Sequence, residues 1–220
     1  MGKKLLLIQP HSDDILFSAS HFLFEAEKYK KVKILTVEFN ADRLLEDESV
    51  CRHFGVELMT LETKADSTNF HKEYYQQHTQ MDDDSAMEFC INKIGKKTFK
   101  KLVKELDKTM EWHKKKGYTI VTCLGVGHPF HWLTRVLTQD SADIFYRDFP
   151  HSYKRRNQAY LNGIVNTEFE LSFTSDPERH HDIKMSLIKS YYKSQSSLLF
   201  FEKRYIEKRL PEEFYEKIED

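Results

Sequence analysis

The chain is poor in the features that would divide it into parts or anchor it in a membrane. It has 7 glycines and 5 prolines in 220 residues. There is no low-complexity linker and no internal repeat, so we expect one domain over residues 1–220. No stretch approaches the roughly 18 apolar residues of a membrane span. The short apolar run at 5–8 is too small for a signal-peptide core and lacks a cleavage site. These absences predict a cytoplasmic protein with no transmembrane span.

The chain also has few cysteines and almost no net charge. The three cysteines, Cys51, Cys90 and Cys123, are widely spaced and form no zinc-knuckle or CxxC pattern. We expect them to be buried free thiols in a reducing compartment. The net charge is −1, from 34 basic and 35 acidic residues, which gives no overall field to attract nucleic acid or a membrane surface. With no basic stripe and no recognition motif, the sequence predicts no nucleic-acid partner.

What the sequence does have is an alternation of apolar strands and amphipathic helices. The apolar runs that predict strands lie at 5–8, 32–39, 56–61 and 118–124. The helical patterns between them lie at 14–30, 46–54 and 98–116. Continuous apolar runs are typical of parallel strands buried on both faces, and their alternation with helices indicates βαβ units. The fold class predicted from this pattern is α/β with a mostly parallel sheet.

The remaining segments are less regular. Residues 62–85 lose the periodic pattern, and a helical region then begins at Ser85. The pattern predicts a strand over 141–147, while 161–174 is left open between two short strands and a loop. Two more helices are predicted, over 180–194 and from Leu198 to the C-terminus, the latter including Phe214 and Tyr215.

Two polar motifs each follow an apolar run. Residues 9–14 read Gln-Pro-His-Ser-Asp-Asp after the run at 5–8, and residues 127–131 read Gly-His-Pro-Phe-His after the run at 118–124. In an open parallel sheet, ligands gather beyond the carboxyl ends of the strands, so both motifs are expected at one edge. Imidazoles and a carboxylate suit zinc, and a metal held there would activate water. The sequence therefore predicts a metal-dependent hydrolase.

Each motif also has an ordinary structural interpretation. Asp13 or Asp14 can cap a helix by accepting hydrogen bonds from first-turn amides. His128 and His131 can be core or surface residues, although a spacing of three would put them on one side of a helix. The occurrence of both motifs after buried strands favours the metal site.

The motifs resemble those of the PIG-L/LmbE-like de-N-acetylases. Residues 10–14 are similar to the family's Pro/Ala-His-Pro-Asp-Asp, and residues 127–131 to its His-Pro-Asp-His. The segment 46–56 resembles a glutamate-rich helix ending in Leu-Gly-Val, and 189–195 resembles a C-terminal helix ending in Ser-Gln. The resemblance implies a Rossmann-like three-layer sandwich. It also implies a zinc-dependent hydrolase that removes an N-acetyl group from an N-acetylated amino sugar or sugar conjugate.

The resemblance also implies the role of each motif residue. His11, Asp14 and His131 match the metal ligands. Asp13 matches the general base that activates water. His128 matches the histidine that stabilises the tetrahedral intermediate or protonates the leaving amine.

Other positions bear on the substrate and on activity. Arg43 follows the second predicted strand, where the family places groups that hold substrate hydroxyls or phosphate; the alternative is a solvated residue at a helix start. Ser12 replaces the family's usual proline. Phe130 replaces an acidic residue that can orient the catalytic histidine, and Val126 stands where some members carry a tyrosine.

These departures keep other functions open. A catalytically weak or inactive sugar-conjugate binder with the same fold is the main alternative, and a metal-dependent phosphoesterase is a third. Residues 151–156, His-Ser-Tyr-Lys-Arg-Arg, either hold a phosphate of the substrate or form a solvated loop. A site of two histidines and one carboxylate also accepts iron(II), cobalt or manganese. The sequence leaves open which substrate is used and whether the protein is a homo-oligomer.

Overall fold

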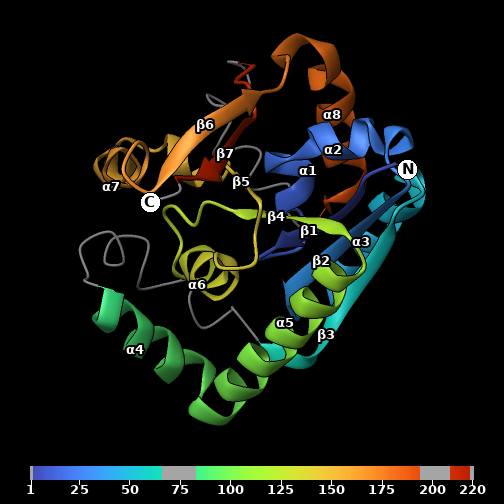
Figure 1. Ribbon diagram of the computed structural model, residues 1–220. Coiled ribbons are helices and arrows are strands. Elements are labelled where there is room, and N and C mark those ends of the chain that lie inside the picture. The colour runs from blue at the N-terminus through green and yellow to red at the C-terminus, as the bar shows by residue number, and fades with distance from the viewer. Residues whose placement is uncertain (1, 66–82, 194–208, 219–220) are drawn as a thin grey trace.

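The computed structural model describes residues 2–65, 83–193 and 209–218 (Figure 1). Their strands form one seven-stranded sheet in the order β3-β2-β1-β4-β5-β7-β6. The strands are β1 (Lys4–Gln9), β2 (Lys31–Glu38), β3 (Glu57–Ala65), β4 (Tyr118–Cys123), β5 (Ile144–Tyr146), β6 (Phe169–Thr174) and β7 (Glu213–Lys217). Strands β1 to β5 pair in parallel, and β7 runs antiparallel between β5 and β6. The predicted α/β fold with a mostly parallel sheet is confirmed, as are the strands predicted before residue 125.

Helices cover both faces of this sheet and make the fold three-layered. One face carries α1 (Asp14–Ser18), α2 (Ser20–Phe24), α3 (Ala41–Phe54) and α8 (Pro177–Tyr191). The other carries α4 (Asp83–Ile94), α5 (Lys96–Lys115) and α6 (Pro129–Thr138). A further helix, α7 (Gln158–Ile164), packs beside β5 and β6.

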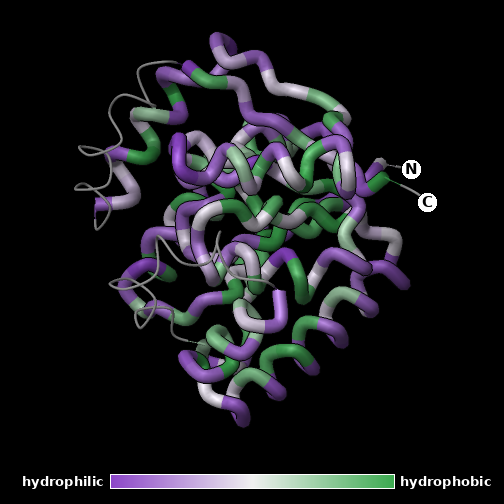
Figure 2. The backbone as a smooth tube through the Cα atoms, turned by 90° about the vertical axis from the view of Figure 1, so that its left-hand side faces the viewer, coloured by the Kyte–Doolittle hydropathy of each residue, from purple (hydrophilic) through white to green (hydrophobic). Residues whose placement is uncertain are grey.

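The sequence pattern of β1 explains why both faces are covered. Successive strand residues point to opposite faces, so Leu5 and Leu7 lie in the core beneath α1, α2, α3 and α8, and Leu6 and Ile8 lie in the core beneath α4, α5 and α6. Figure 2 shows the hydrophobic segments running through the middle of the molecule, while the outer helices alternate between hydrophobic and hydrophilic residues. Each helix is therefore held by one apolar face against the sheet.

The helix predicted over 14–30 is wrong in one respect, because it is broken after α1. Ala19 leaves the helical conformation, with φ −141°. The Glu212 carboxylate accepts hydrogen bonds from the backbone N–H groups of Ser20, at 3.1 Å, and His21, at 2.9 Å. A side chain 192 positions from Ser20 thus caps a new helix at this point, which local periodicity does not reveal.

The C-terminal prediction is also wrong in its last part. Phe214 and Tyr215 lie in strand β7 rather than in a helix, because the edge of β5 takes them as its antiparallel partner. Residues 194–208 lie outside the described part of the chain. The segment 161–174, left open by the sequence, forms the end of α7 and strand β6.

The cysteines and the helix lengths can also be compared with the predictions. The cysteines are buried free thiols, as predicted. Among the described residues, no helix combines the length and apolarity needed to cross a bilayer.

The packing of α5 gives a prediction about stability. Leu106 of α5 is fully buried against the sheet, whereas Leu45 of α3 is 63% exposed. We expect Leu106→Ala to lower the free energy of unfolding by about 2–5 kcal/mol because it leaves a cavity, and Leu45→Ala to change it by less than about 0.5 kcal/mol. Urea unfolding of both variants checks this, and equal losses would contradict the assigned core.

Candidate metal centre

The two polar motifs lie beyond the ends of neighbouring strands. β1 pairs with β2 on one side and with β4 on the other, so the order of the strands along the chain reverses between β1 and β4. Such a reversal point is where open α/β sheets bind ligands, outside the carboxyl ends of the strands. The loop at 10–14 leaves β1 and the loop at 124–128 leaves β4. The sheet therefore brings the two motifs together.

Three donor atoms of these motifs form a compact triangle. His11 Nδ1 lies 2.9 Å from His131 Nε2, and Asp14 Oδ2 lies 3.4 Å from each of these two nitrogens. A tetrahedral zinc ion with bonds of about 2.0–2.1 Å holds its ligand atoms roughly 3.3–3.4 Å apart. The triangle is thus about the size of one face of a tetrahedral metal site, and the donor set fits such an ion.

Asp14 and His131 are an electrostatically matched pair in this triangle. Both are buried. Burial by itself would raise the pKa of Asp14, but His131 and the hydrogen bond with His11 lower it below its ordinary value. The Asp14 carboxylate is therefore stable in its charged form, which is the form that binds a metal.

A second carboxylate, Asp148, fixes the orientation of His131. Asp148 Oδ1 accepts a hydrogen bond from His131 Nδ1 at 2.6 Å, and Asp148 Oδ2 accepts one from the Val126 backbone N–H at 3.0 Å. Because the proton of neutral His131 is used at Nδ1, its Nε2 lone pair points into the triangle. This carboxylate–histidine arrangement is common around metal ligands, where it also increases ligand basicity.

His128 has the opposite proton arrangement. It precedes α6 as the N-cap, and its Nδ1 accepts a hydrogen bond from the Phe130 backbone N–H at 3.2 Å. Neutral His128 therefore carries its proton on Nε2. A backbone amide thus fixes the orientation of the His128 ring. A neutral His128 is a hydrogen-bond donor at this edge rather than a ligand.

Other combinations of donors are close enough together to hold an ion. In the described part of the chain they are His11 with His128 and His131, and Cys123 with His131 and Asp148. The first needs His128 to give up its Nε2 proton. In the second, the thiol is a poor ligand, since burial raises the pKa of Cys123 well above its ordinary value. The set of His11, Asp14 and His131 needs the proton between His11 Nδ1 and His131 Nε2 to leave, but it includes the Asp14 carboxylate, which is already in its charged form.

Asp13 has an unusual backbone conformation. Its φ of 99° and ψ of −29° lie in the left-handed region, where a residue other than glycine costs about 1–3 kcal/mol. The carboxyl group is buried. Burial and the neighbouring Asp14 charge raise its pKa well above its ordinary value, and the positive charge of Arg43 acts in the opposite direction. A strained backbone and a buried carboxyl group with a shifted pKa are both typical of functional residues.

Arg43 lies at the same edge of the sheet. It is in the first turn of α3, where its backbone N–H donates to Asn40 Oδ1 at 3.2 Å. Its guanidinium Nη1 lies 3.5 Å from Glu38 Oε2, and its charge acts on Asp13. The structure thus brings Arg43 near the predicted base.

Three further residues lie at the site; two of them were not predicted there, and the third, His151, was considered only as part of the segment 151–156. They are Asp47, Asp148 and His151. Asp148 directly follows the strand predicted at 141–147, so the rule that located the two motifs also applies to it. The ring of His151 lies 5.0 Å from that of His131 and 5.6 Å from that of His128. Asp47 lies between the two glutamates that carry the family resemblance.

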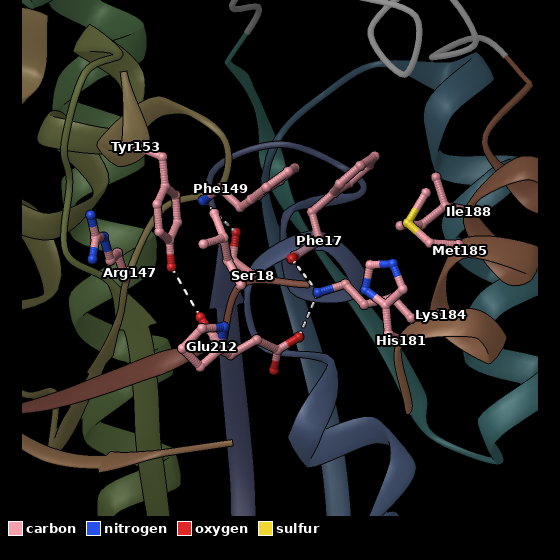
Figure 3. Close-up of a pocket in the computed structure, with 12 residues that line it drawn as sticks. Phe17, Ser18, Arg147, Phe149, Tyr153, His181, Lys184, Met185, Ile188 and Glu212 are labelled. Atoms are coloured by element: carbon pink, nitrogen blue, oxygen red, sulfur yellow. Dashed lines mark hydrogen bonds and ion pairs between the residues drawn. The ribbon is translucent and has the colours of Figure 1, made fainter. Parts of the chain in front are cut away.

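A separate pocket lies between α1 and α8 (Figure 3). Its walls include Phe17, Phe149 and Ile188, and none of the predicted site residues lines it. Lys184 Nζ donates to Phe17 O and to Glu212 Oε1, both at 2.6 Å. The cavity volume is about 30 Å³, which has room for only a few water molecules. Because Lys184 is paired with Glu212 and the cavity is so small, the pocket is a packing gap between α1 and α8 and not a sugar site.

Comparison with known proteins supports this fold. No protein-family model and no curated protein sequence matches the chain. Solved structures do match. A zinc-inhibited form of teicoplanin deacetylase Orf2 has a TM-score of 0.64 at 18% identity, covering 99% of both chains. A deacetylase in complex with teicoplanin has a TM-score of 0.62 at 16% identity, covering 99% of this chain and 100% of the other.

A third match is more distant. N,N′-diacetylchitobiose deacetylase from Pyrococcus horikoshii, in complex with an inhibitor, has a TM-score of 0.53 at 12% identity, covering 93% of this chain and 76% of the other. At these identities the similarity shows the fold. The chain has the fold of solved deacetylases, and the three-layer fold implied by the resemblance is confirmed.

The packing of the second motif gives a prediction. Gly127 has φ +86°, and a Cβ added there would lie 2.2 Å from Asn157 Nδ2 and 3.1 Å from His151 Cβ. We expect Gly127→Ala to lower the free energy of unfolding by about 2 kcal/mol or more, through backbone strain and the clash. Gly163 is the matched control, since it lies in α7 with nothing within 4 Å of its added Cβ. Gly163→Ala should stabilise by up to about 1 kcal/mol; similar losses in both variants would contradict the close packing at Gly127.

Proposed function

We propose that this chain is a metal-dependent hydrolase that removes an N-acetyl group from an N-acetylated amino sugar or sugar conjugate, acting as one domain of residues 1–220. The observation that carries the proposal is the triangle of His11 Nδ1, Asp14 Oδ2 and His131 Nε2, with its sides of 2.9 and 3.4 Å. The deacetylase fold of the structural neighbours supports it.

His11, Asp14 and His131 are the residues that would hold the metal. Two imidazole nitrogens and a carboxylate oxygen suit zinc, and other divalent metals are accepted by the same set. When bound, the metal would supply Lewis-acid chemistry, polarising the amide carbonyl and lowering the pKa of water. The contact of Asp148 with His131 keeps one ligand in place.

Asp13 and His128 would move and hold protons. Asp13 takes a proton from the attacking water as the new C–O bond forms, and that proton goes to the amine nitrogen as the C–N bond breaks. The products are acetate and the free amino sugar. The Nε2–H of neutral His128 donates to the oxygen that becomes negative in the tetrahedral intermediate. The hydrogen bond from the Phe130 N–H supports this donor role.

Arg43 is proposed to bind the substrate. Its guanidinium lies at the carboxyl edge of the sheet beside Glu38. Together the two offer hydrogen-bond donors and acceptors for sugar hydroxyls. This would orient the sugar so that its N-acetyl group reaches Asp13.

A sugar-conjugate binder with little or no activity is the second candidate. Phe130 and Val126 are both fully buried, so neither supplies the polar group that the resembling family has at these positions. The binder hypothesis predicts retention of amino sugars without turnover. Acetate release from any member of a panel that includes N-acetylglucosamine and N,N′-diacetylchitobiose would remove it.

The ligand assignment predicts the metal content of variants. Elemental analysis of purified protein should find about one equivalent of zinc in the wild type and almost none in His131→Ala, because a ligand is lost. His113→Ala is the matched control, since His113 is also buried, beside Thr109 and Tyr118 on α5 and β4. The His113→Ala variant should keep its zinc even if its free energy of unfolding is lower than that of the wild type. Wild-type protein without metal after zinc soaking would contradict the assignment.

The role of Asp13 predicts a separation of binding from turnover. Asp13→Asn should keep its zinc and its fold, because asparagine tolerates the left-handed backbone. Its rate of acetate release should fall by about 10²–10⁴-fold, as expected when a general base is lost. An acetate-release assay on the best substrate of the panel, with metal content measured in parallel, tests this. Full activity in Asp13→Asn would remove Asp13 as the base.

A further inference from the structure

A buried carboxylate lies behind the loop that carries His11, Asp13 and Asp14. Asp47, on α3, is 2% exposed and has no part in the proposed chemistry. Its two oxygens accept four hydrogen bonds. Oδ1 accepts from Tyr192 Oη at 2.7 Å and from the Asp13 backbone N–H at 3.2 Å. Oδ2 accepts from Gln9 Nε2 at 2.7 Å and from Thr36 Oγ1 at 3.0 Å.

The partners of Asp47 define its charge state. A backbone N–H and a side-chain amide NH2 can only donate, and the two hydroxyl groups act as donors as well. Four donors around one carboxyl group fit an ionised, acceptor-only carboxylate. A buried carboxylate is costly unless its hydrogen bonds are satisfied, and this one is satisfied on both oxygens.

These contacts hold the loop at two points. The first is direct, from Asp47 Oδ1 to the N–H of Asp13, the residue in the left-handed conformation. The second is indirect: Asp47 Oδ2 holds Gln9 Nε2, and Gln9 Oε1 accepts from the Ile15 backbone N–H at 3.0 Å. The two anchored amides lie on either side of Asp14, so the backbone conformation of the loop is fixed where it presents its carboxylates.

We propose that Asp47 is a positioning residue that holds the backbone of residues 13–15 and so sets the directions of the Asp13 and Asp14 side chains. The catalytic consequence rests on the proposed function, whereas the structural one does not. Asp47 joins β1, β2, α3 and the residue that follows α8 to the loop through its partners Gln9, Thr36 and Tyr192. A rigid loop is what a site needs when its ligands must stay within a few tenths of an ångström.

Asp47→Asn is the variant that tests this role. Whichever way the new amide is turned, its NH2 group faces two donors. On the Oδ1 side the Asp13 N–H loses its acceptor. On the Oδ2 side Gln9 Nε2 loses one of its two acceptors and keeps only Thr36 Oγ1, at 2.8 Å. One of the two links to the loop must therefore weaken. Tyr192→Phe is the matched control, because it removes a different hydrogen bond from the same Oδ1 and leaves both links in place.

Two measurements on the full-length variants separate positioning from stability. The first is amide hydrogen exchange of residues 12–15 in metal-free protein, normalised to the unfolding free energy of each variant. We expect protection to fall at least tenfold in Asp47→Asn and to stay within about threefold of the wild type in Tyr192→Phe. The second is zinc affinity by competition with a chelator. It should fall about 10–100-fold in Asp47→Asn, the range expected when a group that orients a metal site is removed, and change little in Tyr192→Phe.

The outcomes decide the role of Asp47 independently of the proposed function. Equal changes in the two variants, in proportion to lost stability, would make Asp47 an ordinary buried polar residue and overturn the proposal. Wild-type protein that binds no zinc would contradict the proposed function, while the exchange measurement would still test the hold on the loop. If residues 12–15 lose hydrogen-exchange protection only in Asp47→Asn, the positioning role of Asp47 is supported whether or not the wild type binds zinc.

Discussion

The site depends on one constraint, which is that β1 and β4 are adjacent parallel strands. Their pairing puts the loops after Gln9 and Cys123 side by side at the reversal point of the sheet. His11 and His131 are 120 positions apart in the chain, yet their ring nitrogens lie 2.9 Å apart. The buried apolar residues of both strands hold this arrangement in the core, where helices cover both faces of the sheet. The pairing of β1 with β4 therefore determines both the core of the fold and the geometry of the candidate site.

A second constraint is that several ionisable side chains are buried together at this edge of the sheet. Four aspartates and three histidines of the site are almost fully buried: Asp13, Asp14, Asp47, Asp148, His11, His128 and His131. An unsatisfied charge in such a place costs several kcal/mol, whereas a satisfied one is held rigidly. The described contacts distribute these charges among distinct partners: Asp148 with His131, Asp47 with the loop, and Asp14 with His11 and His131. This division leaves Asp13, the residue in the left-handed backbone conformation, as the carboxylate that we propose as the base.

Much of this could be predicted from sequence, because strand runs and motif positions are local. The early strands, the facing motifs and the α/β class follow from apolar runs that are visible in the sequence itself. Asp148 could have been found by the same edge rule, whereas Asp47 could not, since its role depends on Gln9 and Tyr192, which are distant in the chain. The break at Ala19 and the strand at Phe214 also depend on distant partners, Glu212 and β5. Local pattern thus predicts elements and edges, and tertiary contacts decide where they end and which polar groups support the site.

Anomalous diffraction at the zinc edge, from crystals grown with zinc, tests whether the side chains of His11, Asp14 and His131 bind a metal. We expect one strong peak bonded to His11 Nδ1, Asp14 Oδ2 and His131 Nε2 at about 2.0–2.2 Å. A peak on a different set of donors, such as Cys123 with His131 and Asp148, or no peak at this edge of the sheet, would contradict this ligand assignment.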